Sequence, residues 1–399
     1  MIIKNINART ILNSHADLTV EVVVKTEKGI KGVGSAPKGT STGKHEVKNF
    51  FKNRVKTIKE FNFFLKRKLI GRHVESLKDV FMIEEALLPF GAGITLSTSY
   101  ALIDALSREN DVPKWKILNP EKRFFKHKIT PISKIIGGSV HSGYPQGKLI
   151  LPDIQEFLVF NKARNLEKKI IINKEVHNAL KEELIKNKIV SGVDYEGGWI
   201  APISNVEAFK LLEKAVAKVK ANYKEKIFIG VDIASSNFYK NERYVYYTKI
   251  SEKEKQKYNT EEQYELIKTL IKKYKLKYVE DPFNEEDFMS HAKLTKKTST
   301  MIVGDDLFVT DPERLKRGIE VKACNSIIIK PNQIGSLKKT FETIKIAKKY
   351  KYISVISHRS KETNDDTIAH IGLAQKLPFI KIGIINGERV SKLNALLRN

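Results

Sequence analysis

Six short apolar segments in the second half of the chain each lead into a charged or polar residue. The segments are FIGVD, KYVED, MIVGDD, SIIIK, ISVISH and FIKIG, which carry Asp232, Glu280, Asp305, Lys330, His358 and Lys381. Between them lie helical patterns, the clearest being SLKKTFETIKIAKKY, where Ser336 is a plausible N-cap. A spacing of roughly 25 residues is typical of one strand-plus-helix unit of a β/α barrel. The pattern therefore predicts an α/β fold with a TIM-like barrel.

The charged residues at the strand ends are sorted by sign, as three acids followed by two lysines. The carboxyl ends of barrel strands meet at the active-site face, where clustered carboxylates need a cation. Asp232, Glu280 and Asp305 are thus predicted to be oxygen ligands of Mg²⁺. Lys330 and Lys381 are predicted to hold an anionic substrate, and a lysine surrounded by positive charge has a lowered pKa that suits a base. The alternative is that these acids and lysines form structural salt bridges.

A chain of 399 residues is long for one core, and two domains are expected. Residues 1–35 contain β-branched strand patterns, and residues 90–107 have the pattern of a helix rich in small and apolar residues. The basic, Phe-rich stretch 44–72 is interpreted as a helix with Phe packed inward and Lys outside, an RNA-binding surface being the alternative. The pattern changes near residue 129. We expect an N-terminal α+β domain over residues 1–128 that caps a C-terminal barrel over residues 129–399.

Several longer segments resemble one known family. The opening ILNSHADLTVEV, the loop APKGTSTGKHE, and the segments FVTDPERLKRGIE, IIIKPNQIGSL and VISHRSKETNDDTIAH are similar to enolase sequences. The resemblance implies an enolase-type barrel under an N-terminal capping domain. It also implies Mg²⁺-dependent, reversible dehydration of 2-phosphoglycerate to phosphoenolpyruvate in glycolysis and gluconeogenesis. Two Mg²⁺ ions per site and a homodimer or larger homo-oligomer follow from the same resemblance.

The resemblance also implies roles for individual residues. Catalysis falls to Glu196, Lys330, Glu156 and His141, substrate binding to Lys381, His358, Arg359, Ser360 and Glu156, and metal binding to Asp232, Glu280, Asp305 and Ser41. Lys330 would take the C2 proton of the substrate. Glu196, with Glu156, would help the C3 hydroxyl leave as water. Arg359 and Ser360 would grip the phosphate.

The loops expected to touch substrate depart from the family pattern. In VDYEGG, Tyr195 replaces the family's Asp, Asp194 lies one place earlier, and a bulky phenol is expected beside Glu196. His141 is displaced by one position from the family's loop histidine, whose aligned place is taken by Val140. Because such loops complete catalytic sites, an enolase paralogue acting on another phosphorylated or carboxylated 2-substituted acid is an alternative.

Composition adds a basic charge and a compartment. The net charge of +26 comes mostly from Lys spread along the whole chain, which reflects either coding bias or an anionic partner. A non-catalytic enolase-like protein that binds nucleic acid is therefore a further alternative. The single Cys324 excludes an intramolecular disulfide and fits a reducing cytoplasm. No uninterrupted apolar run reaches the roughly 18 residues of a membrane span, and no membrane association is expected.

Overall fold

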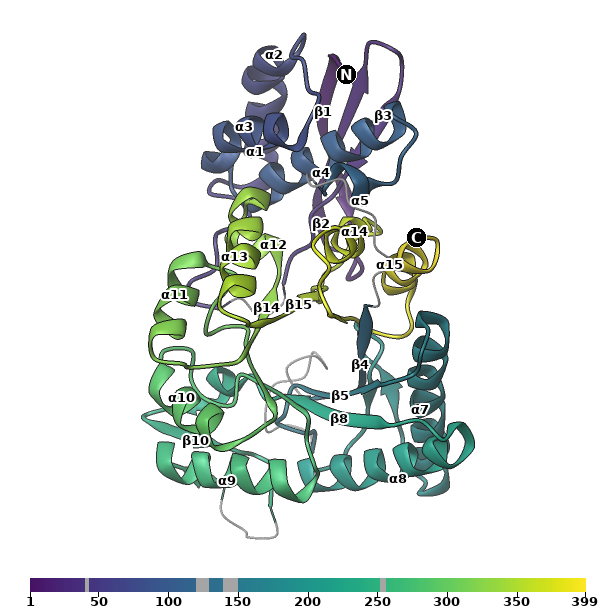
Figure 1. The fold of residues 1–399 in the computed structure, drawn as a ribbon, viewed down its shortest axis with the longest axis vertical. Helices are drawn as coiled ribbons and strands as arrows, with labels where there is room; N and C mark the ends of the chain where they lie inside the picture. The colour runs from purple at the N-terminus through teal and green to yellow at the C-terminus, as the bar shows by residue number, and fades with distance from the viewer. Residues whose placement is uncertain (40–42, 120–128, 139–149, 252–255) are drawn as a thin grey trace.

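The computed structural model describes residues 1–39, 43–119, 129–138, 150–251 and 256–399. A small sheet-and-helix domain, purple to blue in Figure 1, lies against one side of a larger β/α barrel, teal to yellow. Within the described residues, no helix is long and apolar enough to cross a bilayer. The predicted combination of an N-terminal α+β domain with a β/α barrel is confirmed.

The N-terminal domain is built on three antiparallel strands, in the order β1 (Ile3–Leu12), β2 (Leu18–Thr26) and β3 (Lys31–Gly34). The predicted helix rich in small residues is α4 (Ala92–Glu109), which packs across β2 and β3 and is almost wholly buried. A Cβ on Gly34 would lie 2.3 Å from the backbone nitrogen of Ala101. The glycine in β3 is thus what allows the helix to approach so closely.

The basic, Phe-rich stretch forms a broken helix. This helix consists of α1 (Arg54–Glu60), a π-helical turn η1 (Phe61–Leu65) and α2 (Lys66–Leu69). The other helices of the domain are α3 (Leu77–Leu87), the 3₁₀ turn η2 (Leu88–Phe90) and, after α4, α5 (Lys114–Ile117). Phe61 is buried as predicted, but Phe63 and Phe64 are 57% and 61% exposed. The inward packing predicted for these two rings is wrong. Phe63 lies about 200° around an α-helix from Phe61 and cannot share its buried face, and the π turn moves Phe64 further from that face.

Eight strands close the barrel. Their order is β4 (Thr130–Gly137), β5 (Glu156–Asn161), β8 (Ile227–Asp232), β12 (Tyr278–Glu280), β13 (Met301–Gly304), β14 (Ser326–Ile329), β15 (Ile353–Ser357) and β16 (Phe379–Lys381), which pairs back onto β4. All neighbours are parallel except β5, which is antiparallel to β4 and β8. Glu156, the first residue of β5, therefore pairs with Asp232, the last residue of β8.

Helices surround the barrel, as Figure 1 shows. They are α7 (Leu166–Lys186), α8 (Asn205–Tyr223), α9 (Thr260–Lys273), α10 (Phe288–Lys297), α11 (Pro312–Glu320), α12 (Pro331–Ile334), α13 (Leu337–Lys349), α14 (Thr367–Ala374) and α15 (Gly387–Leu397). Two short strands, β6 (Gly192–Val193) and β7 (Trp199–Ile200), extend the barrel sheet, since β7 pairs with β4. A separate small sheet of β9 (Tyr239–Lys240), β10 (Arg243–Val245) and β11 (Lys257–Tyr258) follows the 3₁₀ turn η3 (Ser235–Phe238). The predicted cap of α13 is confirmed, since the Ser336 side chain accepts from the Lys339 amide.

A layer of apolar side chains fills the inside of the barrel and separates its two ends. Seven buried residues form it, with three more packed against them: Ile132, Leu158, Phe160, Tyr278, Val303, Ile328 and Val355, then Phe228, Met301 and Phe379. Every strand of the barrel contributes at least one of these residues. The polar strand ends thus lie on one side of an apolar floor, as in other barrels of this architecture.

A buried carboxylate joins the two domains. Glu84 of α3 accepts hydrogen bonds from the Ser336 hydroxyl and from the backbone amides of Leu337 (2.9 Å) and Lys338 (3.0 Å), at the start of α13. The Ser99 hydroxyl of α4 also donates to it, at 2.9 Å. A carboxylate from the N-terminal domain therefore caps a barrel helix, where the free amides and the helix dipole favour a negative charge.

Glu84→Ala is expected to lower the free energy of unfolding by about 3 kcal/mol, because buried donors lose a charged acceptor. Urea denaturation measures this change. The control is Glu85→Ala, which removes an exposed ion pair with Lys338 from the next position of the same helix. That variant should stay within about 0.5 kcal/mol of the unmodified protein. Equal losses in the two variants would contradict the assigned role of Glu84.

Candidate active site

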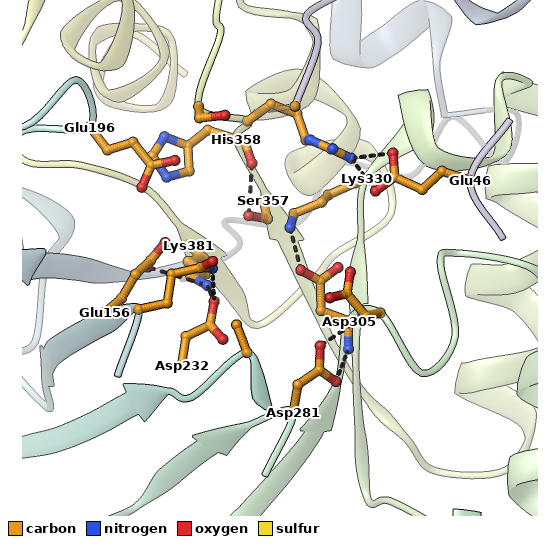
Figure 2. A pocket seen from close by; sticks show the side chains of 16 residues that line it. Glu46, Glu156, Glu196, Asp232, Asp281, Asp305, Lys330, Ser357, His358 and Lys381 are labelled. Carbon is orange, nitrogen blue, oxygen red and sulfur yellow. Dashed lines mark hydrogen bonds and ion pairs between the residues drawn. The ribbon is translucent and has the colours of Figure 1, made fainter. Parts of the chain in front are cut away.

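One pocket at the polar end of the barrel gathers most of the predicted residues, as Figure 2 shows. It is lined by Gly39, Glu46, Gln155, Glu156, Glu196, Asp232, Ala234, Asp281, Asp305, Asp306, Lys330, Ser357, His358, Arg359, Ser360 and Lys381. Glu280 contacts Lys381 directly beside this lining. The predicted residues Ser41 and His141 lie outside the described residues.

Lys381 lies among three carboxylates. Its Nζ is 2.7 Å from Asp232 Oδ2, 2.9 Å from Glu280 Oε1 and 3.3 Å from Glu156 Oε2. Burial disfavours the charge of Lys381, but the negative charges of Asp232, Glu156 and Glu280 raise its pKa well above the ordinary value. The antiparallel direction of β5 is what brings Glu156 here, from the first residue of a strand rather than the last.

Lys330 and Asp305 form a second ion pair across the pocket. Asp305 also accepts a hydrogen bond from Gln333 Nε2 at 2.8 Å. Burial opposes ionisation of Asp305, yet Lys330 and then Lys381 lower its pKa to about 2. Burial likewise disfavours the charge of Lys330, but Asp305 raises its pKa above the ordinary value. The lowered pKa expected for a lysine base is therefore wrong for this structure, in which both lysines form the ion pairs that the alternative interpretation described.

Three pocket-lining acids were not predicted from the sequence: Glu46, which pairs with Arg359, and the neighbours Asp281 and Asp306. Asp281 follows β12 and accepts the backbone amides of Asp305 (3.0 Å) and Asp306 (2.7 Å). One oxygen from each of Asp281, Asp305 and Asp306 lies within 4.8 Å of the others. Burial, with the charge of Asp305, raises the pKa of Asp306 to about 8. The sequence did contain a signal for Asp281 and Asp306, because two successive strand ends carry acidic doublets rather than single acids.

The donor set fits a divalent cation. Seven of the pocket-lining residues named above are acidic, against three that are basic. Asp232 Oδ1 is buried and has no hydrogen-bond partner among the described residues. Burial and the nearby Asp232 raise the pKa of Glu280 well above its ordinary value. Carboxylates that are crowded, buried and in excess over the lysines are what a hard cation such as Mg²⁺ neutralises.

The pocket lining also contains a cationic side chain, Arg359, and a neutral imidazole, His358. Arg359 is buried, and its NH1 donates to both oxygens of Glu46 at 3.1 Å. His358 is buried beside it, and burial, followed by the charge of Arg389, lowers its pKa well below the ordinary value. His358 Nδ1 has no hydrogen-bond partner among the described residues. The pocket thus offers a planar cation and a neutral imidazole to an anionic ligand.

The predicted position of Tyr195 beside the site is wrong. Its side chain is 51% exposed and stacks on His15, with ring centroids 3.7 Å apart. Asp194 points inward instead, because its Oδ1 accepts the backbone amides of Glu196 and Gly198, both at 2.9 Å. Asp194, which lies one position earlier than the Asp of the family pattern, is thus the side chain that the turn directs into the protein.

Lys134 is the second kind of residue that the sequence analysis missed. It lies within β4 and is buried, with its Nζ 2.6 Å from Asp194 Oδ2 and 2.9 Å from Glu196 Oε2. The available signal was a lone lysine in the otherwise mostly apolar strand TPISKIIG. A buried lysine requires an acidic partner, and here it has two.

Comparison with known proteins gives the family. The family model described as the enolase N-terminal domain matches residues 3–118, and the family model described as the enolase C-terminal TIM barrel domain matches residues 128–399. A relative named enolase from Methanosphaera stadtmanae is 37% identical over 414 residues, covering 100% of this chain and 96% of the relative. The enolases of Archaeoglobus fulgidus (36%; 100% and 97% covered) and Pyrobaculum aerophilum (34%; 98% and 94% covered) are similar over nearly their whole lengths. The chain therefore belongs to the enolase family, and it is an enzyme of the hydro-lyase class of carbon–oxygen lyases.

Proposed function

We propose that the protein catalyses the Mg²⁺-dependent, reversible dehydration of 2-phosphoglycerate to phosphoenolpyruvate. The observation that carries the proposal is the pocket in which buried Lys381, mostly buried Lys330, a set of carboxylates and Arg359 face one another. Relatives named enolase that align over the full chain support it. The proposed setting is cytoplasmic glycolysis or gluconeogenesis, in a homo-oligomer.

The first step is removal of the C2 proton, which we assign to Lys330. A proton next to an ionised carboxylate is weakly acidic, and two bound Mg²⁺ ions would supply electrostatic stabilisation for the charge that develops on that carboxylate. Asp232, Glu280 and Asp305 would hold these ions, together with Ser41. Arg359 and Lys381 each lower the pKa of Lys330, while Asp305 raises it. If the Asp305 carboxylate also binds a cation, it raises the pKa of Lys330 less. The pKa of Lys330 is then lower, as a general base requires.

The second step is loss of the C3 hydroxyl as water, which we assign to Glu196 and Glu156. Hydroxide is a poor leaving group, so a carboxyl group must deliver a proton as the C–O bond breaks. Burial raises the pKa of Glu156 to about 7. Both side chains line the pocket on the side opposite Lys330 (Figure 2). Base and acid on opposite sides of one substrate suit an elimination. His141 is proposed to assist this step.

Substrate recognition is assigned to the remaining cations. Lys381, which already contacts three carboxylates, would bind the carboxylate end of the substrate together with the metal ions. Arg359 and Ser360, with His358 beside them, would bind the phosphate, because a planar guanidinium matches phosphate oxygens in pairs. Arg359 would exchange its present partner, Glu46, for the phosphate.

The direct test is formation of phosphoenolpyruvate, followed by absorbance, from 2-phosphoglycerate with purified protein and Mg²⁺. Activity that disappears with a chelator and returns with Mg²⁺ is expected. An inactive protein that is folded by thermal melting would exclude the proposed reaction and favour a different 2-substituted acid as substrate.

A further inference from the structure

We propose that Lys134 is a positioning residue for the loss of the C3 hydroxyl: its ammonium group, anchored by Asp194, donates to Oε2 of Glu196 and fixes this carboxyl group at the edge of the active-site pocket, so that the proton that leaves with the hydroxyl is carried on the other carboxyl oxygen. The inference rests on the proposed dehydration, because it concerns one step of that reaction. Lys134 does not itself line the pocket, so it acts through Glu196.

The ammonium of Lys134 is shared by two carboxylates from one turn. The Nζ atom lies 2.6 Å from Asp194 Oδ2 and 2.9 Å from Glu196 Oε2, and all three residues are buried. The other oxygen of Asp194 accepts the amides of Glu196 and Gly198. Asp194 therefore fixes both the backbone that carries Glu196 and the ammonium that holds its side chain.

Glycines from three segments make room for this cluster. A Cβ on Gly137 would lie 2.0 Å from Asp194 Oδ2, and one on Gly198 would lie 3.0 Å from the Lys134 side chain. A Cβ on Gly383, beyond β16, would lie 1.9 Å from the backbone oxygen of Glu196. The backbone thus encloses the cluster on several sides. Such close packing keeps the ion pair in one arrangement, unlike a surface pair that samples many.

The position of the Glu196 carboxylate matters for one half of the reaction only. Lys330, the proposed base for C2, lies across the pocket with Asp305 and belongs to a separate ion pair. A proton donor works only within hydrogen-bond reach of the leaving oxygen, and small displacements cost large factors in rate. Disturbing Lys134 should therefore slow departure of the hydroxyl while leaving C2 proton removal intact. A purely structural lysine would not separate the two steps.

The test compares two variants, Lys134→Met and the double variant Lys134→Met with Asp194→Asn. The first removes the cation and leaves two buried carboxylates. The second also removes one of those charges, and the Asn side chain retains the oxygen that accepts the two turn amides. With Mg²⁺ and 2-phosphoglycerate, we expect phosphoenolpyruvate formation to fall about 100-fold in both. Exchange of the C2 proton with deuterated solvent, followed by NMR, should stay within about twofold of the unmodified protein, and KM should change little.

The control is Lys114→Met, which breaks another ion-pair cluster, partly buried and outside the pocket, with Asp366 (2.9 Å) and Asp104 (3.4 Å). It should lower the melting temperature without altering the ratio of exchange to dehydration. Folded Lys134 variants that keep full dehydration, or that lose exchange and dehydration in parallel, would overturn the assignment. Unmodified protein without dehydration activity would instead refute the proposed function, and the inference with it.

Discussion

Lys330→Ala is expected to slow exchange of the substrate's C2 proton by at least about 10²–10⁴-fold, the usual loss when a general base is removed. Lys330 extends from the end of β14 into the pocket, where no other lysine than Lys381 lines the described surface. Lys381 already contacts three carboxylates and is poorly suited to accept a proton. NMR of 2-phosphoglycerate in deuterated solvent measures the exchange directly, without requiring the later loss of water.

The matched control for this variant is Lys338→Ala, which removes an exposed lysine from the nearby helix α13. Its exchange rate should equal that of the unmodified protein. Calorimetry should also find Mg²⁺ binding nearly intact in Lys330→Ala, since the acids at the other strand ends are unchanged. Rapid exchange in Lys330→Ala would assign the base to a different residue.

Asp232→Asn is expected to weaken Mg²⁺ binding by at least about 100-fold, because even residues that only orient metal ligands cost 10- to 100-fold. The folded state should tolerate the change. Lys381 keeps Glu280 and Glu156 as partners, and the repulsion that raises the pKa of Glu280 is relieved. The melting temperature without metal should therefore hold or rise. Calorimetric titration with Mg²⁺ and a thermal melt give the two quantities.

Glu225→Gln is the control for Asp232→Asn, because Glu225 stands just before β8, at the opposite end of the strand that ends on Asp232. It pairs with Lys168 and should leave Mg²⁺ affinity unchanged. Equal Mg²⁺ affinity in Asp232→Asn and the unmodified protein would mean that the acidic strand ends serve structure alone.

The barrel was predictable because its parallel strands obey one rule, with a buried body and a functional residue at the carboxyl end. The rule does not extend to β5. Its residues are buried along the whole strand, as those of the parallel strands are, so nothing in the pattern reveals its direction. The prediction for Glu156 depended on resemblance alone. The inward packing predicted for Phe64 failed for a related reason, since the π turn at Phe61–Leu65 cannot be recognised from residue spacing.

The site was predictable where each residue acts by its own charge and not where it acts through a neighbour. Five charged strand ends could be picked out singly, and the structure gathers them around one pocket. Lys134 and Asp194 become meaningful only as a pair, which requires knowledge of how β4 lies beside the turn at Asp194–Glu196. The same holds for Tyr195, whose direction is decided by hydrogen bonds to the side chain before it.

The Glu84 cap has a consequence for any attempt to recombine enzymes of this kind. Lys330, α12 and the capped start of α13 form one short run of chain, so the N-terminal domain anchors the segment that carries the proposed base. A chimera that joins this barrel to a foreign N-terminal domain would lose the anchor while every pocket residue of the barrel kept its identity. Transfer of this active site to another protein therefore requires the contact between the domains as well as the barrel.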